Sequence, residues 1–391
     1  MTSGLAKVLI VYKEFPAPSV GHAGGEAVFR LLVALHRRGH DVSLVARLRR
    51  EEADLVAETT PYCRQIVTVP HHSALPGPFP LAFGRSYLAL RRAAARALRE
   101  IRPDLLHVEV TQTAACLLGL SRPRSSFRPL DVNWFLLEQR AAGETGLRRW
   151  ADRVLAGLLR RIEPWLCRRY DLIAAVSEGD RRLLAAHCRP RPVLVLPLAP
   201  VGAAAQPAPL PVPPGPNLLF VGAMYRTFNI QGVRWFVEQV WPQVLAQVPQ
   251  ARFYIVGHRP AAEVCALDDG QHVFVTGFVE EPVSWYRAAA VFVAPLRVAG
   301  GLLQKVVDAL ALGVPVVCTT VSNHGVGAAP GEHLLVADDA ASFARAVVRL
   351  LEDPAEGQRL ARAGQQFVRQ QYDLEAAVDR WIAAWGVDGE R

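Results

Sequence analysis

The sequence lacks the features that mark disulfide-stapled, zinc-binding or membrane-spanning proteins. Its six cysteines form no C-x-x-C pair and most stand in apolar or helical surroundings, which predicts reduced, buried thiols. The longest uncharged stretch, 192–225, is broken by prolines and cannot form a spanning helix. No signal-peptide layout precedes the first apolar run, 7–13. We therefore expect a cytoplasmic protein, either soluble or peripheral at the inner face of the membrane.

Lysine is also scarce: the chain has only Lys7, Lys13 and Lys305, so arginine carries nearly all of its positive charge. The charge is uneven, because residues 1–200 hold 30 Lys and Arg against 18 Asp and Glu, whereas residues 201–391 hold 14 against 18. A basic first half favours an anionic partner, such as a membrane surface or an anionic acceptor, although an arginine-rich composition without function is the alternative. Nucleic acid is not expected as a partner, since no reader motif accompanies the charge.

Strand and helix patterns alternate twice along the chain. Short apolar, β-branched runs such as KVLIVYK, PDLLHVEV, FRPLDVN and DLIAAVS alternate with amphipathic stretches, and the same order restarts at NLLFVGAM. This predicts an α/β protein with two Rossmann-like, doubly wound parallel-sheet domains. We place the first domain at 1–198, a Pro/Ala-rich linker at 199–216, the second domain at 217–370 and a C-terminal helix at 371–391.

The segment 300–317, GGLLQKVVDALALGVPVV, has the pattern of an anion-binding turn. Gly300 and Gly301 let the backbone approach a bulky anion, and the helix that follows offers free N–H groups to a diphosphate. Lys305 would add a charge-assisted contact, and Asp308 would accept hydrogen bonds from ribose hydroxyls. The alternative is an ordinary helix in which Lys305 and Asp308 form a solvated i,i+3 ion pair.

The same segment resembles the donor-binding segment of the retaining glycosyltransferases of family 4, which have the GT-B fold. The resemblance continues through LLFVGAMYRTFNIQGVRWF, FYIVGHRP, VFVTGFVE and VFVAPL, and at the front through VLIVYKEFPAPSVGHAGGEAVF and DLIAAVSEGDRRLL. It covers nearly the whole chain and is strongest at 217–340.

The resemblance implies two Rossmann-like domains enclosing a cleft, with a nucleotide-diphospho-sugar donor in the second domain. The first domain would hold a glycan, lipid-linked or small-molecule acceptor, and the C-terminal helix would pack back on it. No cofactor or metal is implied, since helix N-termini and basic side chains offset the diphosphate charge. Transfer would retain the sugar's stereochemistry, in polysaccharide or glycoconjugate biosynthesis.

Matching positions carry the family's roles over to this sequence. Lys305 and, by a looser match, Arg226 would stabilise the leaving phosphate as catalytic groups. The residues expected to bind the donor are Gly222, Gly300, Gly301, Leu302, Leu303 and Asp308. The residues expected in the acceptor and cleft loop are His22, Gly24, Gly25, Glu26 and Asn133; for Glu26, a helix N-terminal charge cap is the alternative.

Two positions depart from the family pattern. Gly300 stands where the family has a sugar-contacting Glu, and Val132 stands where it often has a His. A degenerate protein that binds a nucleotide-sugar or a partner without turnover is therefore the alternative function.

An arginine-rich segment, 146–171, carries seven arginines around Trp150, Leu158 and Trp165. One interpretation is an amphipathic element that touches anionic lipid. The other is an internal helix with a solvated arginine face.

Overall fold

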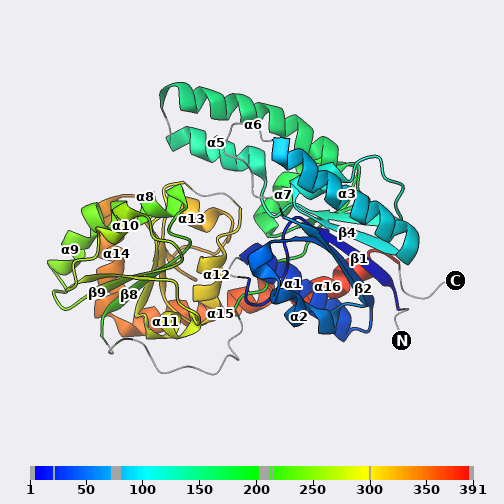
Figure 1. Ribbon diagram of the computed structural model, residues 1–391. Coiled ribbons are helices and arrows are strands. Elements are labelled where there is room, and N and C mark those ends of the chain that lie inside the picture. The colour runs from blue at the N-terminus through cyan, green and yellow to red at the C-terminus, as the bar shows by residue number, and fades with distance from the viewer. Residues whose placement is uncertain are drawn as a thin grey trace. The chain divides into compact units, whose positions relative to one another are not determined.

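The computed structural model describes residues 5–20, 23–71, 81–143, 145–201, 212, 215–298 and 301–386. The chain forms two compact units (Figure 1): 1–134 with 155–199 and 373–391, and 135–154 with 200–372. Residues 135–154, which we had placed in the first domain, thus group with the second unit. Most of the expected linker, 202–211 and 213–214, lies outside the described residues.

The first unit is built on a seven-stranded parallel sheet in the order β3-β2-β1-β4-β5-β6-β7. Its central strands are buried on both faces, as parallel strands covered by helices must be. The strands are β1 (Lys7–Tyr12), β2 (Asp41–Leu48), β3 (Gln65–Pro70), β4 (Leu105–Glu109), β5 (Arg124–Arg128), β6 (Leu172–Ala175) and β7 (Val193–Val195).

Two strands of this sheet differ from expectation. The predicted strand FRPLDVN is wrong in its bounds, because β5 ends at Arg128, just before Pro129, and a helix begins at Asn133. Proline lacks the N–H that a central strand must donate. The edge strand β3 was missed, since its side chains are only partly buried and its pattern is correspondingly weak.

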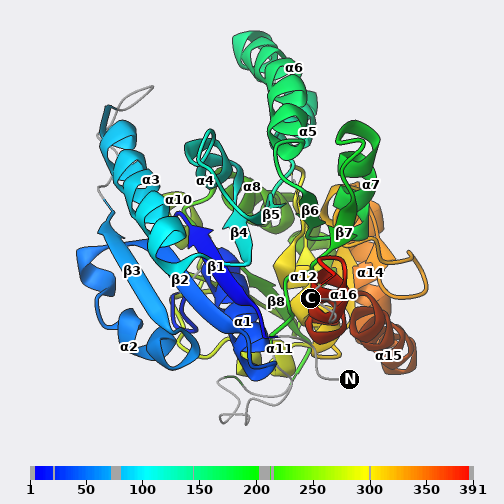
Figure 2. The same cartoon turned by 90° about the vertical axis from the view of Figure 1, so that its right-hand side faces the viewer.

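Helices cover the sheet of the first unit, and the last of them returns from the far end of the chain. In α16, Leu374, Val378 and Trp381 are buried in the same core as β1, and Arg38 binds Asp379 at 2.6 Å. Figures 1 and 2 show this last helix returning to the first unit. The helices with residues in this unit are α1 (Ala23–Arg37), α2 (Leu55–Thr59), α3 (Leu81–Ile101), α4 (Thr111–Cys116), α5 (Asn133–Gly143), α6 (Gly146–Cys167), α7 (Glu178–His187) and α16 (Leu374–Ala383), with 3-10 turns at Arg50–Glu52 and Thr60–Tyr62.

The second unit has a six-stranded parallel sheet in the order β10-β9-β8-β11-β12-β13. The strand order reverses between β8 and β11, which makes their carboxyl ends the topological switch point where open α/β sheets bind ligands. The strands are β8 (Asn217–Val221), β9 (Arg252–Val256), β10 (Val273–Gly277), β11 (Val291–Ala294), β12 (Val316–Cys318) and β13 (Leu335–Val336).

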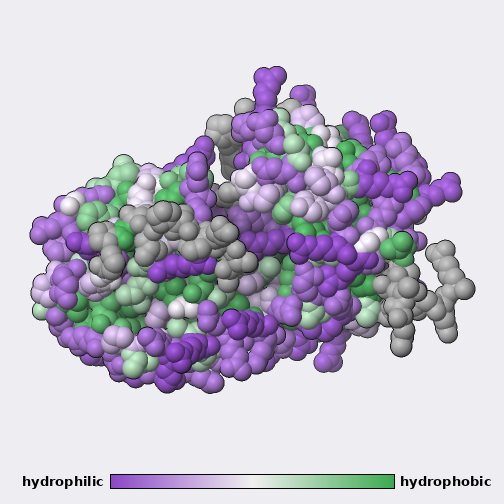
Figure 3. Space-filling model, turned by 90° about the horizontal axis from the view of Figure 1, so that it is seen from below, coloured by the Kyte–Doolittle hydropathy of each residue, from purple (hydrophilic) through white to green (hydrophobic). Residues whose placement is uncertain are grey.

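The helical segment that follows β8 is interrupted. Between α8 (Thr227–Trp235) and α9 (Trp241–Leu245), residues Phe236–Val240 form a π-helical turn, just before Pro242, which has no N–H to donate. The other helices of this unit are α10 (Ala262–Cys265), α11 (Val283–Ala288), α12 (Gln304–Ala311), α13 (Thr320–His324), α14 (Ala340–Glu352) and α15 (Pro354–Gln371). On the face shown in Figure 3, hydrophilic side chains predominate and apolar ones form patches between them.

A fully buried charged network lies within the first sheet. The Arg128 guanidinium donates two bonds of 3.0 Å from Nε to the Glu109 carboxylate and a third of 2.6 Å from Nη2. His107 lies 2.9 Å from Glu109 through Nε2 and 2.5 Å from Ser126 Oγ through Nδ1, so it is a packed strand histidine. Despite burial, Arg128 and His107 hold the pKa of Glu109 down to about 2.

Glu109→Gln should destabilise the chain by about 3 kcal/mol, because it leaves the buried Arg128 charge without its counter-ion. Urea unfolding of the full chain, followed by intrinsic fluorescence, measures the loss. The matched control is Glu100→Gln, whose carboxylate is exposed and 3.8 Å from Arg96; such a surface pair should change stability by less than about 1 kcal/mol. Equal losses in the two variants would contradict this role for Glu109.

Candidate functional site

The predicted donor residues meet at the carboxyl edge of the second sheet. Gly222 directly follows β8, and α12, which carries Lys305 and Asp308, follows β11. These are the two strands on either side of the switch point. The fold therefore places one glycine turn and the helix that carries Lys305 where a ligand is expected.

Lys305 is held by groups from β8 and α8. Its Nζ donates a 2.8 Å hydrogen bond to Asn229 Oδ1 and lies 4.0 Å from the centre of the Phe220 ring. The buried Asn229 is itself oriented by a 2.9 Å bond from Nδ2 to the Ala223 carbonyl. The ammonium is thus fixed at the edge of the sheet by one neutral acceptor and one aromatic face.

Gly222 makes room for that ammonium. A Cβ at this position would lie 2.6 Å from Lys305 Nζ and 2.9 Å from Asn229 Nδ2. The turn after β9 packs closely on Gly222, since a Cβ on Gly257 would lie 1.7 Å from the Gly222 carbonyl oxygen. Glycine at 222 therefore sets where the cation can sit.

Lys305 lies near a second cation, Arg226. Burial, and then the nearby Arg226 guanidinium, lower the pKa of Lys305 to about 7, although the side chain as a whole keeps some exposed surface. Within the described residues, no carboxylate forms an ion pair with Lys305 or with Arg226. Two cations without a counter-ion favour an anionic ligand, and such a ligand would raise the pKa of Lys305 again.

The start of α12 adds backbone donors to the same edge. Leu303 precedes the helix without a side-chain cap, and in the described structure the amides of Leu302 and Leu303 donate to no acceptor. Gly301 has a φ of +65°, and a Cβ on Gly325 would lie 1.9 Å from its carbonyl oxygen, so the two turns pack backbone to backbone. An uncapped helix N-terminus beside two cations is suited to a phosphate group.

Asp308 is buried and already bonded. Its Oδ1 accepts 3.0 Å from the Val201 amide and 2.8 Å from Gln304 Nε2. The alternative of an exposed Lys305–Asp308 ion pair is therefore wrong, because the two side chains point to different partners. A ribose contact for Asp308 stays a prediction.

The other predicted site residues belong to the first unit or lie outside the described residues. His22 and Gly300 fall outside them. Gly24, Gly25 and Glu26 form the first turn of α1, where Glu26 lies 3.6 Å from Arg30 and burial raises its pKa. Asn133 begins α5 and donates to Glu163 and, at 3.4 Å, to Thr111 Oγ1. An acceptor role for these residues stays a prediction.

Sequence reasoning missed Asn229 and Phe220, the two groups that hold Lys305. Asn229 had a usable signal, since a buried asparagine inside an apolar helix must bond to something specific. Phe220 had none, because a phenylalanine in a buried strand is ordinary core.

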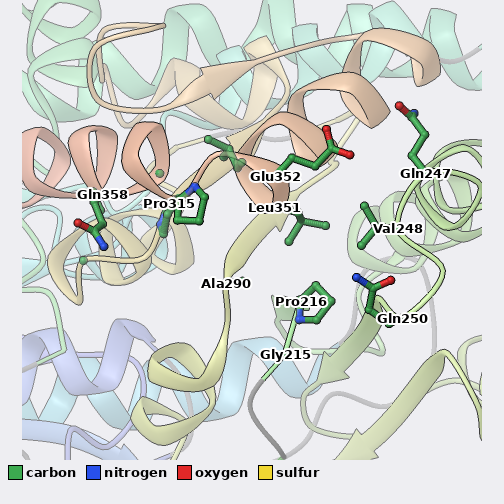
Figure 4. A pocket seen from close by; sticks show the side chains of 15 residues that line it. Gly215, Pro216, Gln247, Val248, Gln250, Ala290, Pro315, Leu351, Glu352 and Gln358 are labelled. Carbon is green, nitrogen blue, oxygen red and sulfur yellow. The ribbon is translucent and has the colours of Figure 1, made fainter.

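A separate pocket lies elsewhere in the second unit. A pocket of about 510 Å³ is lined by residues that precede β8, β9, β11 and β12, among them Pro216, Gln250, Ala290 and Pro315 (Figure 4). It therefore opens at the amino edge of the sheet, opposite the edge that carries Lys305, and is separate from the site described here.

Two parallel Rossmann-like sheets, with a basic, glycine-lined switch point in the second, define the GT-B class of fold. The sucrose-phosphate synthase of Thermosynechococcus elongatus superposes with a TM-score of 0.72 at 19% identity, over 97% of this chain and 98% of that one. Anabaena HepE, in a complex with UDP and glucose, superposes with a TM-score of 0.67 at 12% identity, over 97% and 99%. At these identities the likeness shows the fold.

The family follows from the sequence models. Residues 24–199 match the model for Glycosyltransferase Family 4, and residues 215–353 match that for Glycosyl transferases group 1. Together they span most of the chain, which therefore belongs to these glycosyltransferases. A Klebsiella pneumoniae relative, an uncharacterized 44.6 kDa protein in the cps region, is 26% identical over 165 residues. The match covers 40% of this chain and 42% of that protein.

Gly222→Ala should displace the Lys305 ammonium without unfolding the unit, because the clash falls on the mobile end of a long side chain. Loss of a charge-assisted contact predicts roughly tenfold weaker binding of UDP, used here as an anionic probe, in calorimetry. The control is Gly157→Ala, where an added Cβ meets nothing within 4 Å. Unchanged UDP affinity in Gly222→Ala would show that this glycine does not position the cation.

Proposed function

We propose that the protein is a retaining glycosyltransferase that moves a sugar from a nucleotide-diphospho-sugar to a glycan, lipid-linked or small-molecule acceptor. The observation that carries the proposal is the Lys305 ammonium, fixed 2.8 Å from Asn229 Oδ1 at the switch point with Arg226 nearby. A diphosphate leaving group develops negative charge as the glycosidic bond breaks, and prepositioned cations stabilise that charge most.

Retention without a protein nucleophile fits these groups. The leaving phosphate oxygen would take the proton of the acceptor hydroxyl on the same face of the sugar, while Lys305, Arg226 and the amides at the start of α12 bind the phosphates. The two cations and the helix N-terminus would offset the diphosphate charge, so we propose that no metal or cofactor takes part.

The relatives suggest the first donor and pathway to test. UDP and glucose occupy the HepE complex, which favours UDP-sugars as first candidates. The Klebsiella relative lies in a cps region, which supports polysaccharide or glycoconjugate biosynthesis. We place the protein in the cytoplasm, where nucleotide-sugars are its donor partners and nucleic acid is not a partner.

The alternative function, binding without turnover, has one structural observation in its favour. Val132, which stands where the family often has a histidine, is 2% exposed, so this position offers no polar contact to a ligand. A donor panel separates the two functions. Nucleotide release from UDP-, GDP- and TDP-sugars, with and without candidate acceptors, would support transfer, whereas donor binding without release would favour the alternative.

With the donor that the panel identifies, Lys305→Ala should lower kcat by about a hundredfold or more, as loss of one transition-state donor does. Folding should be unaffected, because the substitution removes a partly buried cation that has no counter-ion. The matched control is Lys7→Ala, at an exposed lysine. Equal kcat values in the two variants would show that Lys305 has no catalytic role.

Donor binding should take up a proton above neutral pH. The pKa of Lys305 is about 7 in the free protein, and a bound diphosphate raises it, so the protonated form is the one that binds. Affinity should therefore fall as pH rises above 7, by up to about tenfold per pH unit. Calorimetry in buffers of different ionisation enthalpy counts the protons; a nucleotide-sugar is suitable because its own diphosphate does not titrate there. A pH dependence that survives in Lys305→Met would assign the proton to another group.

A further inference from the structure

Helix α6 buries its carboxylates and exposes large apolar side chains, the reverse of an ordinary amphipathic helix. Asp152, Ala156, Glu163 and Leu166 are buried and recur at helical spacing, so they share one face. Asp152 pairs with Arg140 of α5, and Glu163 accepts from Asn133 and, at 3.4 Å, from the Trp134 amide. These contacts join α6 to α5, and the two helices run side by side (Figures 1 and 2).

The opposite face of α6 is apolar and exposed. Of the eleven large apolar side chains that are exposed in the described part of the chain, seven lie on this helix. Six recur every three or four residues and form one stripe along the helix: Leu147, Trp150, Val154, Leu158, Ile162 and Trp165, with exposures of 80, 63, 53, 52, 42 and 42%. A stripe of this length on a soluble surface marks an interaction site.

Arginines surround this stripe, and the helix itself places no carboxylate on its exposed face. The exposed arginines of α6 are Arg148, Arg149, Arg153, Arg160 and Arg161. The only two acidic residues of the helix, Asp152 and Glu163, are on the buried face. Just beyond the helix, the Arg169 guanidinium lies 4.8 Å from the centre of the Trp165 ring. The exposed surface of α6 is therefore an apolar stripe flanked by arginines.

We propose that this face of α6 docks on a lipid surface that contains anionic headgroups. Leucine, isoleucine and tryptophan would enter the boundary between headgroups and acyl chains, while the arginines would bind phosphate groups on either side. A second copy of the chain fits poorly, because a symmetric contact would bring like charges together. No described helix is long and apolar enough to cross a membrane, so the helix would lie in the interface plane.

Flotation of the full-length protein with vesicles tests this surface. The probes are phosphatidylcholine alone and phosphatidylcholine mixed with an equal amount of phosphatidylglycerol. We expect binding to the mixed vesicles that weakens with salt, since screening reduces the charge-dependent part. The triple variant Arg148→Gln, Arg149→Gln, Arg153→Gln should bind about a hundredfold more weakly, because each basic residue near such a surface contributes roughly fivefold.

Matched variants separate this surface from general charge and hydrophobicity. The triple variant Arg345→Gln, Arg362→Gln, Arg369→Gln removes the same charge from exposed positions on α14 and α15 and should bind like the wild type. Trp150→Ser with Leu158→Ser should lose binding roughly tenfold or more, whereas Leu88→Ser on α3 should not. Circular dichroism confirms that each variant is folded.

Three results would overturn the proposal. The first is equal binding to both vesicle types, and the second is equal loss in the α6 and control arginine variants. The third is a dimer in sedimentation that Trp150→Ser with Leu158→Ser converts to a monomer, without vesicle binding by the wild type. None of these results depends on sugar transfer, so the surface and the proposed function fail separately.

Discussion

The hydrogen bond from the Lys305 ammonium to Asn229 Oδ1 is the contact on which the candidate site depends. A neutral acceptor orients the cation but does not cancel its charge, as a carboxylate would. Burial, and then the nearby Arg226 guanidinium, lower the pKa of Lys305 to about 7. The Lys305 site is thus suited to an anion in a way that an ordinary surface ion pair is not.

This arrangement requires the backbone to come unusually close at three turns. A Cβ at Gly222, Gly257 or Gly325 would collide with Lys305, with the Gly222 carbonyl or with the Gly301 carbonyl, respectively. Gly222 and Gly257 directly follow β8 and β9, and Gly325 packs on the Gly301 carbonyl in the turn between β11 and α12, so all three lie at the carboxyl edge of the sheet. Because glycine has no side chain, these turns leave room for a ligand and expose backbone N–H and C=O groups to it.

The sequence predicted the α/β class and the position of most strands, because both depend on local pattern and chain order. Gly222, Arg226 and Lys305 were assigned to the donor site through the resemblance, and a donor role for them stays a prediction. The sequence analysis did not predict the edge strand β3, whose partial burial depends on tertiary packing, or the interruption of the helix at Phe236–Val240, for which Pro242 was an overlooked local signal. The partners of Asp308 were equally out of reach, since Val201 lies 107 residues away in the chain and donates through its backbone. Long-range contacts of backbone atoms leave no mark on residue type.

Two buried clusters in the described residues differ in how their positive charge is balanced. In the first sheet, Arg128 and Glu109 neutralise each other completely, and the network is closed to solvent. In the second, Lys305 has only a neutral partner, and the charge is left for something else to bind. The same contrast holds on α6, whose carboxylates are satisfied inside while its arginines face outward. Both features, a cation held by a neutral acceptor and arginines around an apolar stripe, support the anionic partners proposed above.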